Sequence, residues 1–144
     1  MAHFQSKEFE EYVDSLKHDL ATTESPRVII PVFHIYLEHM LSLIIEKRIH
    51  DGKKFLKNSS NGFYEKIKLL KELTILSDDE YHDLNLINQT RNEFTHKFKP
   101  DLQALAEKIF KLKFHTYNKN VDPKTIIIYD ILQIMMHLEQ KLLN

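Results

Sequence analysis

Apolar side chains recur every three or four positions along most of the chain, which is the spacing of one face of an α-helix. The expected helices cover roughly residues 4–22, 26–49, 63–73, 78–97, 102–112 and 122–142. The only competing strand signal is the short β-branched stretch at 125–129. The pattern predicts an all-α fold, a single-domain bundle of about five to six helices over residues 1–144.

The segment 26–49 is apolar nearly all round, which is typical of a helix at the centre of a bundle. Ser25 is expected to cap it, with Pro26 at its first position and a kink or late start at Pro31. The polar residues 51–62 read as a loop.

The composition removes several classes of site. With only two glycines, the chain cannot build a phosphate-cradling glycine loop, and without cysteine it has no disulfide or thiolate zinc site. No apolar run approaches the ~20 residues that cross a bilayer, and charge near the start argues against a signal peptide. We therefore expect a cytoplasmic protein without membrane contact.

Charge is unevenly distributed although the net charge is only −1. Residues 1–24 carry two lysines against six acids, whereas residues 97–124 carry seven lysines against three acids. A local basic surface is therefore expected, against the alternative that these lysines simply line a solvated face.

The segment 78–97 is the most informative. Ser77 and Glu80 form a capping-box pattern at its start, and Pro100 lies beyond its end. The expected buried stripe consists of Leu84, Ile87, Arg91, Phe94 and Phe98. An arginine on a buried stripe is costly unless it is paired, and the polar run 88–92 contains poor helix formers. Such a mismatch is typical of a functional site.

Asn88, Asn92 and His96 are spaced to form one ridge of that helix. His96 lies about 140° around the helix from Arg91, so the two converge only at a distorted helix end or across an interface with a second copy. The alternative is structural: Arg91 pairs with an acid from another helix, while His96, Lys97 and Lys99 complement the helix dipole.

The stretch Arg91-Asn92-Glu93-Phe94-Thr95-His96 resembles the Arg-polar-x(3–5)-His signature of HEPN domains, which are small helical bundles. The segment Tyr36–Ile44 resembles the Leu-Glu-x-x-Leu helix of the branch that contains mannitol operon repressors. Phe63–Leu73 followed by the arginine motif has the order of that branch, so the resemblance covers roughly residues 27–98.

The resemblance implies metal-independent RNA cleavage of the toxin or defence type. In this role His96 would move protons at the ribose 2′-hydroxyl and leaving group, Arg91 would stabilise the phosphate, and Asn92 would position one of them. Asn88, Thr95, Lys97 and Lys99 would contact substrate. Active members pair their motifs, which implies a homodimer.

The alternative within the same resemblance is a non-catalytic regulatory module that binds a protein partner, such as an antitoxin or a regulator. A departure from the active pattern is the near-neutral charge, with no basic groove evident beyond a few lysines. No cofactor is expected. His34 and Glu38 could place two metal ligands on one helix face, but a third is not evident.

Overall fold

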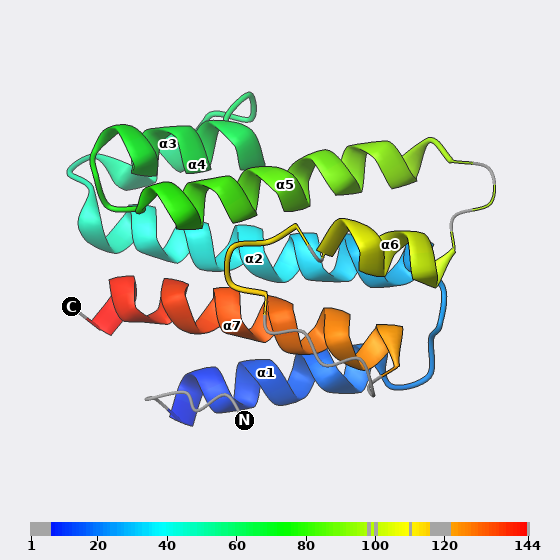
Figure 1. Ribbon diagram of the computed structural model, residues 1–144. Helices are drawn as coiled ribbons and strands as arrows, with labels where there is room; N and C mark the ends of the chain where they lie inside the picture. Colours follow the sequence, from blue (N-terminus) through cyan, green and yellow to red (C-terminus); the bar gives the residue numbers. More distant parts are fainter. Residues whose placement is uncertain (1–6, 98, 100, 110, 116–121, 144) are drawn as a thin grey trace.

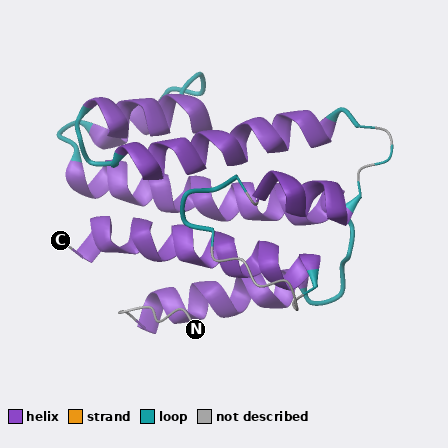
Figure 2. Cartoon of the chain, viewed as in Figure 1, coloured by secondary structure: helices purple, strands orange, loops and turns teal. Residues whose placement is uncertain are grey.

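The computed structural model of the chain describes residues 7–97, 99, 101–109, 111–115 and 122–143. Within these residues every regular element is a helix (Figure 2). The elements are α1 (Lys7–Leu20), α2 (Pro26–Arg48), α3 (Gly52–Lys57), α4 (Phe63–Glu72), α5 (Asp78–Thr95), α6 (Leu102–Ile109) and α7 (Pro123–Leu143). The all-α prediction is confirmed.

One local expectation about the elements is wrong. Residues 51–62 are not wholly a loop, because they include α3, which brings the helices to seven in the described part of the chain. A polar composition does not exclude a short helix that is held by its packing, and α3 packs against α2. The predicted last helix is confirmed, because α7 (Pro123–Leu143) includes the β-branched stretch at 125–129.

Helix α2 occupies the centre of the molecule (Figure 1) and contacts α1, α3, α4, α5 and α7. The helix begins at Pro26, as predicted, and continues through Pro31 without a late start. The Ser25 side chain makes no capping hydrogen bond. By length and composition α2 could span a membrane, so the expectation that no stretch is long enough is wrong. Half of that apolar window is buried inside the molecule, as in the core helix of a globular protein.

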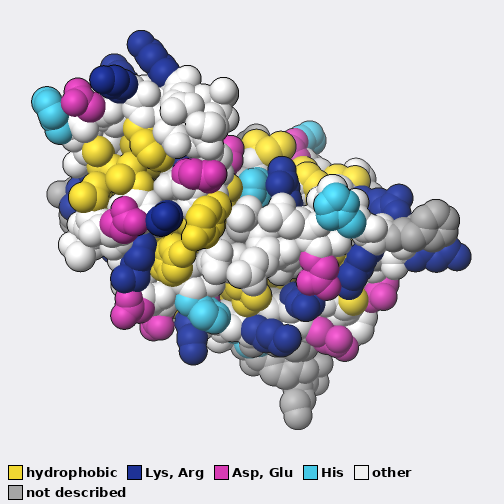
Figure 3. Space-filling view, turned by 90° about the horizontal axis from the view of Figure 1, so that it is seen from above, with side chains coloured by type: hydrophobic (Ala, Val, Ile, Leu, Met, Phe, Trp, Pro, Cys, Tyr) yellow, Lys and Arg dark blue, Asp and Glu magenta, His cyan; other side chains and the backbone are white. Residues whose placement is uncertain are grey.

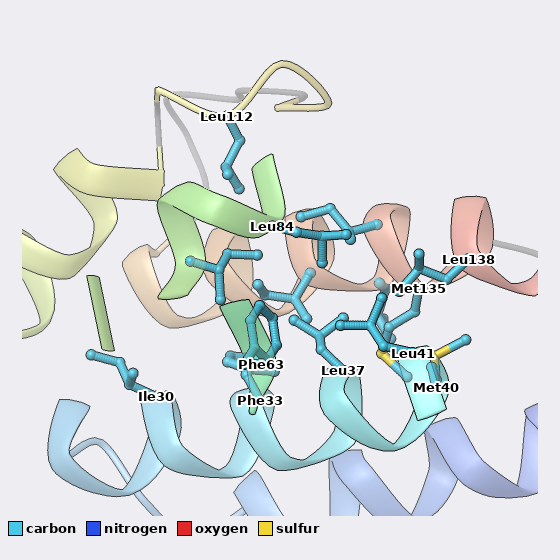
Figure 4. Packing of buried hydrophobic residues seen from close by; sticks show 14 of the residues in the cluster. Ile30, Phe33, Leu37, Met40, Leu41, Phe63, Leu84, Leu112, Met135 and Leu138 are labelled. Atoms are coloured by element: carbon cyan, nitrogen blue, oxygen red, sulfur yellow. The ribbon is translucent and has the colours of Figure 1, made fainter. Parts of the chain in front are cut away.

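The core is built around one side of α2. Leu37, Met40 and Leu41 of α2 meet Leu84 of α5 and Met135 of α7 (Figure 4). These side chains are fully buried. Their packing fixes α5 beside α2, and this pair of helices carries the residues that the sequence singles out.

Both ends of α5 follow from local chemistry. At the start, Ser77 Oγ accepts from the Glu80 amide at 3.1 Å and Glu80 Oε1 accepts from the Ser77 amide at 2.8 Å, which confirms the capping box. At the other end the helix stops at Thr95, and His96 is its C-cap. The helix therefore ends two residues before the predicted end, and His96 lies just outside it.

Candidate functional site

Arg91 does not lie on the buried stripe of α5. That stripe contains Thr90 instead, and Arg91 is exposed. The Thr90 hydroxyl donates to the Leu86 carbonyl at 2.7 Å, so threonine satisfies its polar group within its own helix, as a buried arginine could not. Phe98, the last residue of the expected stripe, lies outside the described residues.

The Arg91 guanidinium has no carboxylate within ion-pair distance in the part of the chain that the structure describes. Its Nη1 donates instead to Oδ1 of the neighbouring Asn92 at 3.0 Å. Arg91 is therefore not a structural charge held by an acid from another helix. The contact with Asn92 leaves a cation at the surface beside a polar side chain that orients it.

Arg91 borders a hollow of about 350 Å³ between the start of α2 and the end of α5. The lining residues are Pro26, Arg27, Ile30, Pro31, Arg91, Phe94 and Thr95. The two helix ends lie at the same end of the bundle (Figure 1). The hollow therefore combines two arginines with an apolar wall.

Sequence reasoning missed Arg27, because nothing near it in the chain resembles a motif. Its Nη2 donates to the Lys97 carbonyl oxygen at 3.0 Å, which ties the start of α2 to the chain beyond α5. A signal that could have found it is the rarity of arginine in this chain. Of the twenty lysine and arginine residues, only Arg27, Arg48 and Arg91 are arginines. Only the packing of α2 on α5 places Arg27 beside Arg91.

Asn88 is turned toward α2 rather than toward the hollow. Its Oδ1 lies 3.1 Å from Nε2 of His34, a nearly buried side chain that stacks on Phe63. Burial lowers the pKa of His34 below its ordinary value, the hydrogen bond to Asn88 opposes this, and the charge of Arg91 adds to the lowering. Asn88 therefore supports His34, and the expected ridge of Asn88, Asn92 and His96 is not one open surface.

His96 and Thr95 have different surroundings. The Thr95 hydroxyl donates to the Arg91 carbonyl at 2.7 Å, so it lines the hollow with its proton already engaged. His96 is exposed and is not among the lining residues of the hollow. Within one chain, the structure therefore does not bring His96 and Arg91 to a common site.

The basic segment is partly neutralised by the fold. Lys97 and Lys108 both pair with Glu93, at 3.1 and 3.3 Å, and Lys124 pairs with Glu24 at 3.5 Å. Lys97 also places its ammonium 4.5 Å from the centre of the Phe94 ring. Lys99 is exposed. Across the face shown in Figure 3, lysine and arginine side chains alternate with acidic ones, so that face presents no continuous basic field.

Two other features bear on alternative sites. Among the described residues, no three histidine, aspartate or glutamate side chains gather into a metal site, and Glu38 pairs with Lys66 at 3.6 Å. A larger hollow of about 710 Å³ lies where α1, α2 and α7 meet, and its lining includes none of the predicted site residues.

Comparison of the chain with protein-family models, with curated proteins and with solved structures finds no match.

Proposed function

We propose that the protein acts on RNA, binding a backbone phosphate through Arg91 and cleaving the chain without a metal ion at a cleft that two copies share. The observation that carries the proposal is the environment of Arg91. Its guanidinium is exposed, borders a hollow and contacts Asn92, with no carboxylate paired to it in the described residues. An uncompensated arginine beside a hollow is suited to bind an anionic group.

The roles follow from the chemistry of RNA. A neutral His96 would take the proton from a ribose 2′-hydroxyl, whose oxygen attacks the adjacent phosphorus. The bond to the 5′-oxygen then breaks, and this oxygen takes a proton from a histidinium. The charge that develops on the phosphate oxygens would be stabilised by Arg91, held in place by Asn92. Histidine suits both proton steps near neutral pH because its reference pKa is about 6.5.

A second copy supplies what one chain lacks. His96 is the C-cap of α5 and does not line the hollow beside Arg91. If two copies place these helix ends against each other, the His96 of one can reach the phosphate held by the Arg91 of the other. Two-fold symmetry would create two equal sites.

The test is incubation of purified protein with mixed RNA in EDTA. We expect cleavage by the wild type, and a loss of at least about 100-fold in Arg91→Ala and His96→Ala, because each removes a transition-state interaction. Arg48→Ala and His50→Ala are matched controls, since both side chains are exposed and lie outside the hollow. Equal cleavage by all five proteins, or a requirement for a divalent ion, would overturn the proposal.

The second candidate is a non-catalytic module that binds a protein partner. The exposed side chains of Val28 and Ile35 on α2 favour it, because two large apolar residues seven positions apart share one helix face. In this case RNA would stay intact in the assay above, while Ile35→Asp would abolish binding to the partner protein.

A further inference from the structure

The hollow between α2 and α5 is lined by a second arginine, Arg27, that the proposed function does not use. Arg27 and Arg91 come from different helices and line the same space of about 350 Å³. This volume lies near the lower end of the range for small-molecule sites, roughly 300–1,000 Å³. A hollow of this size can hold one phosphate with the group attached to it.

The position of Arg27 is set by the fold. Its Nη2 donates to the Lys97 carbonyl oxygen, so the side chain is tied to the chain segment that follows α5. A guanidinium carries five N–H donors in a planar fork, and a bond to a carbonyl is compatible with binding phosphate oxygens. Because the side chain is held in place beforehand, a ligand would lose less conformational entropy on binding.

The acids nearest to the hollow along the chain are already engaged. Glu24, just before α2, pairs with Lys124, and Glu93, beside Phe94, pairs with both Lys97 and Lys108. The lining itself contains two arginines and, in the described part of the chain, no acid. The lining therefore carries two positively charged side chains although the protein as a whole has a net charge of −1.

The remaining walls are apolar. Apart from the two arginines, the lining consists of four apolar residues and one threonine: Pro26, Ile30, Pro31, Phe94 and Thr95. The Thr95 hydroxyl is already hydrogen-bonded within its own helix. A free inorganic phosphate would leave this surface uncovered. A phosphate attached to a ribose or a base would cover it.

We infer that Arg27 and Arg91 together bind one phosphodiester group of single-stranded RNA, with the attached nucleoside against the apolar wall of the hollow. The inference rests on the proposed function for the identity of the ligand, and it adds Arg27 as a binding residue. It also means that a single copy of the chain binds RNA, whereas cleavage requires two.

The experiment measures binding of a labelled 2′-O-methyl oligouridylate of about ten nucleotides, a length within the usual footprint of single-strand binding sites. Its blocked 2′-oxygen prevents cleavage, so fluorescence anisotropy reports binding alone. We expect Arg27→Gln and Arg91→Gln each to raise Kd about tenfold or more, because each removes charge-assisted hydrogen bonds. Arg27→Lys, which keeps the charge but loses the fork, should fall between the wild type and Arg27→Gln.

Arg48→Gln is the matched control. Arg48 lies at the other end of α2, is exposed, and donates to the Lys141 carbonyl at 3.2 Å, much as Arg27 donates to that of Lys97. We expect its Kd to equal that of the wild type. Circular dichroism and the thermal midpoint of each variant establish that it is folded, and Arg27→Lys provides the test if Arg27→Gln does not fold.

The outcomes separate the two proposals. If Arg91→Gln weakens binding and Arg27→Gln does not, the two-arginine site is wrong while the proposed function stands. If the wild type binds the oligonucleotide but does not cut RNA, the site stands and the proposed cleavage fails. If the wild type does not bind at all, both fail.

The source of the phosphate is tested with two further ligands. The same oligonucleotide with a 5′-phosphate should bind no more tightly, and uridine 5′-monophosphate should compete only weakly. A strict requirement for the terminal phosphate would overturn the phosphodiester assignment.

Discussion

At the scale of single residues, Asp83 shows how a buried carboxylate can hold a chain segment that has no regular structure. It is fully buried in α5 and accepts from the amides of Lys113 and Phe114, at 2.7 and 2.9 Å. His82 Nδ1 lies 2.9 Å from the same carboxylate. Asp130 of α7, also fully buried, pairs with His115 of the same segment.

Removing this anchor should destabilise the protein. We expect Asp83→Ala to lower the free energy of unfolding by about 3 kcal/mol, because the amides of Lys113 and Phe114 lose the buried carboxylate that accepts from them. Urea denaturation measures this change. Asp79→Ala, an exposed change in the first turn of the same helix, should lower it by no more than about 1 kcal/mol. Equal losses in the two variants would contradict the anchoring role.

His34 should make stability depend on pH. Because its pKa is lowered in the folded protein, the unfolded chain binds the proton more readily. The contribution of His34 is therefore complete above the ordinary histidine value of about 6.5 and is lost as pH falls toward the lowered value. We expect the thermal midpoint to decrease when the pH is lowered from about 7.5 to about 5.

The control for this prediction is His34→Gln, which cannot titrate and keeps a donor that can reach Asn88. Arg91, Glu38 and Lys66 also act on His34, and they remain in the variant. The decrease in thermal midpoint should be smaller in His34→Gln than in the wild type. An identical decrease would assign the pH dependence to other histidines.

At the scale of elements, α3 depends on one glycine. A Cβ at Gly52 would lie 2.2 Å from the Ile45 carbonyl oxygen of α2, which is backbone and cannot rotate away. The close approach of the two helices therefore requires glycine. This is the element that sequence reasoning missed, since Gly52 and its neighbours read as a loop by composition.

The chain provides its own control for that close contact. We expect Gly52→Ala to destabilise the protein by about 1–3 kcal/mol through overpacking, although alanine favours helix more than glycine does. Gly62→Ala should cost less than about 1 kcal/mol, because the nearest atom to its added Cβ would be 4.0 Å away. Urea denaturation of both variants measures the difference, and equal effects would contradict the packing argument.

At the scale of the whole molecule, the proposed cleft requires two copies. The outer face of α5 is polar around Arg91, whereas the neighbouring α2 exposes Val28 and Ile35. We therefore expect a dimer at micromolar concentration in which this apolar face of α2 is buried. Sedimentation velocity measures the oligomeric state.

In the dimer, Ile35→Asp would place a charge in the contact. It should yield a monomer that binds the oligonucleotide but no longer cleaves RNA. Leu73→Asp is the control, because Leu73 is comparably exposed at the end of α4, away from the hollow. A monomeric wild type, or dissociation by both substitutions, would contradict this arrangement.

The sequence by itself determined the elements whose causes are local. The capping box at Ser77, the start of α2 at Pro26 and the all-round apolar surface of α2 depend on neighbouring residues and on helical spacing. The capping box and the start of α2 at Pro26 are both present in the folded protein. The local sequence pattern also singled out Arg91 and Asn92 as candidate site residues, and their side chains are in contact in the structure.

Tertiary structure alone decided what the site contains. Helical spacing leaves the phase of a buried stripe uncertain by one position, and the docking of α5 on α2 buried Thr90 and exposed Arg91. Arg27 and Arg91 are 64 positions apart in the sequence, so no local pattern could place them around one hollow. The hydrogen bond between Asn88 and His34 was also not predictable from the sequence, because the partner of a polar side chain depends on which helix packs against it.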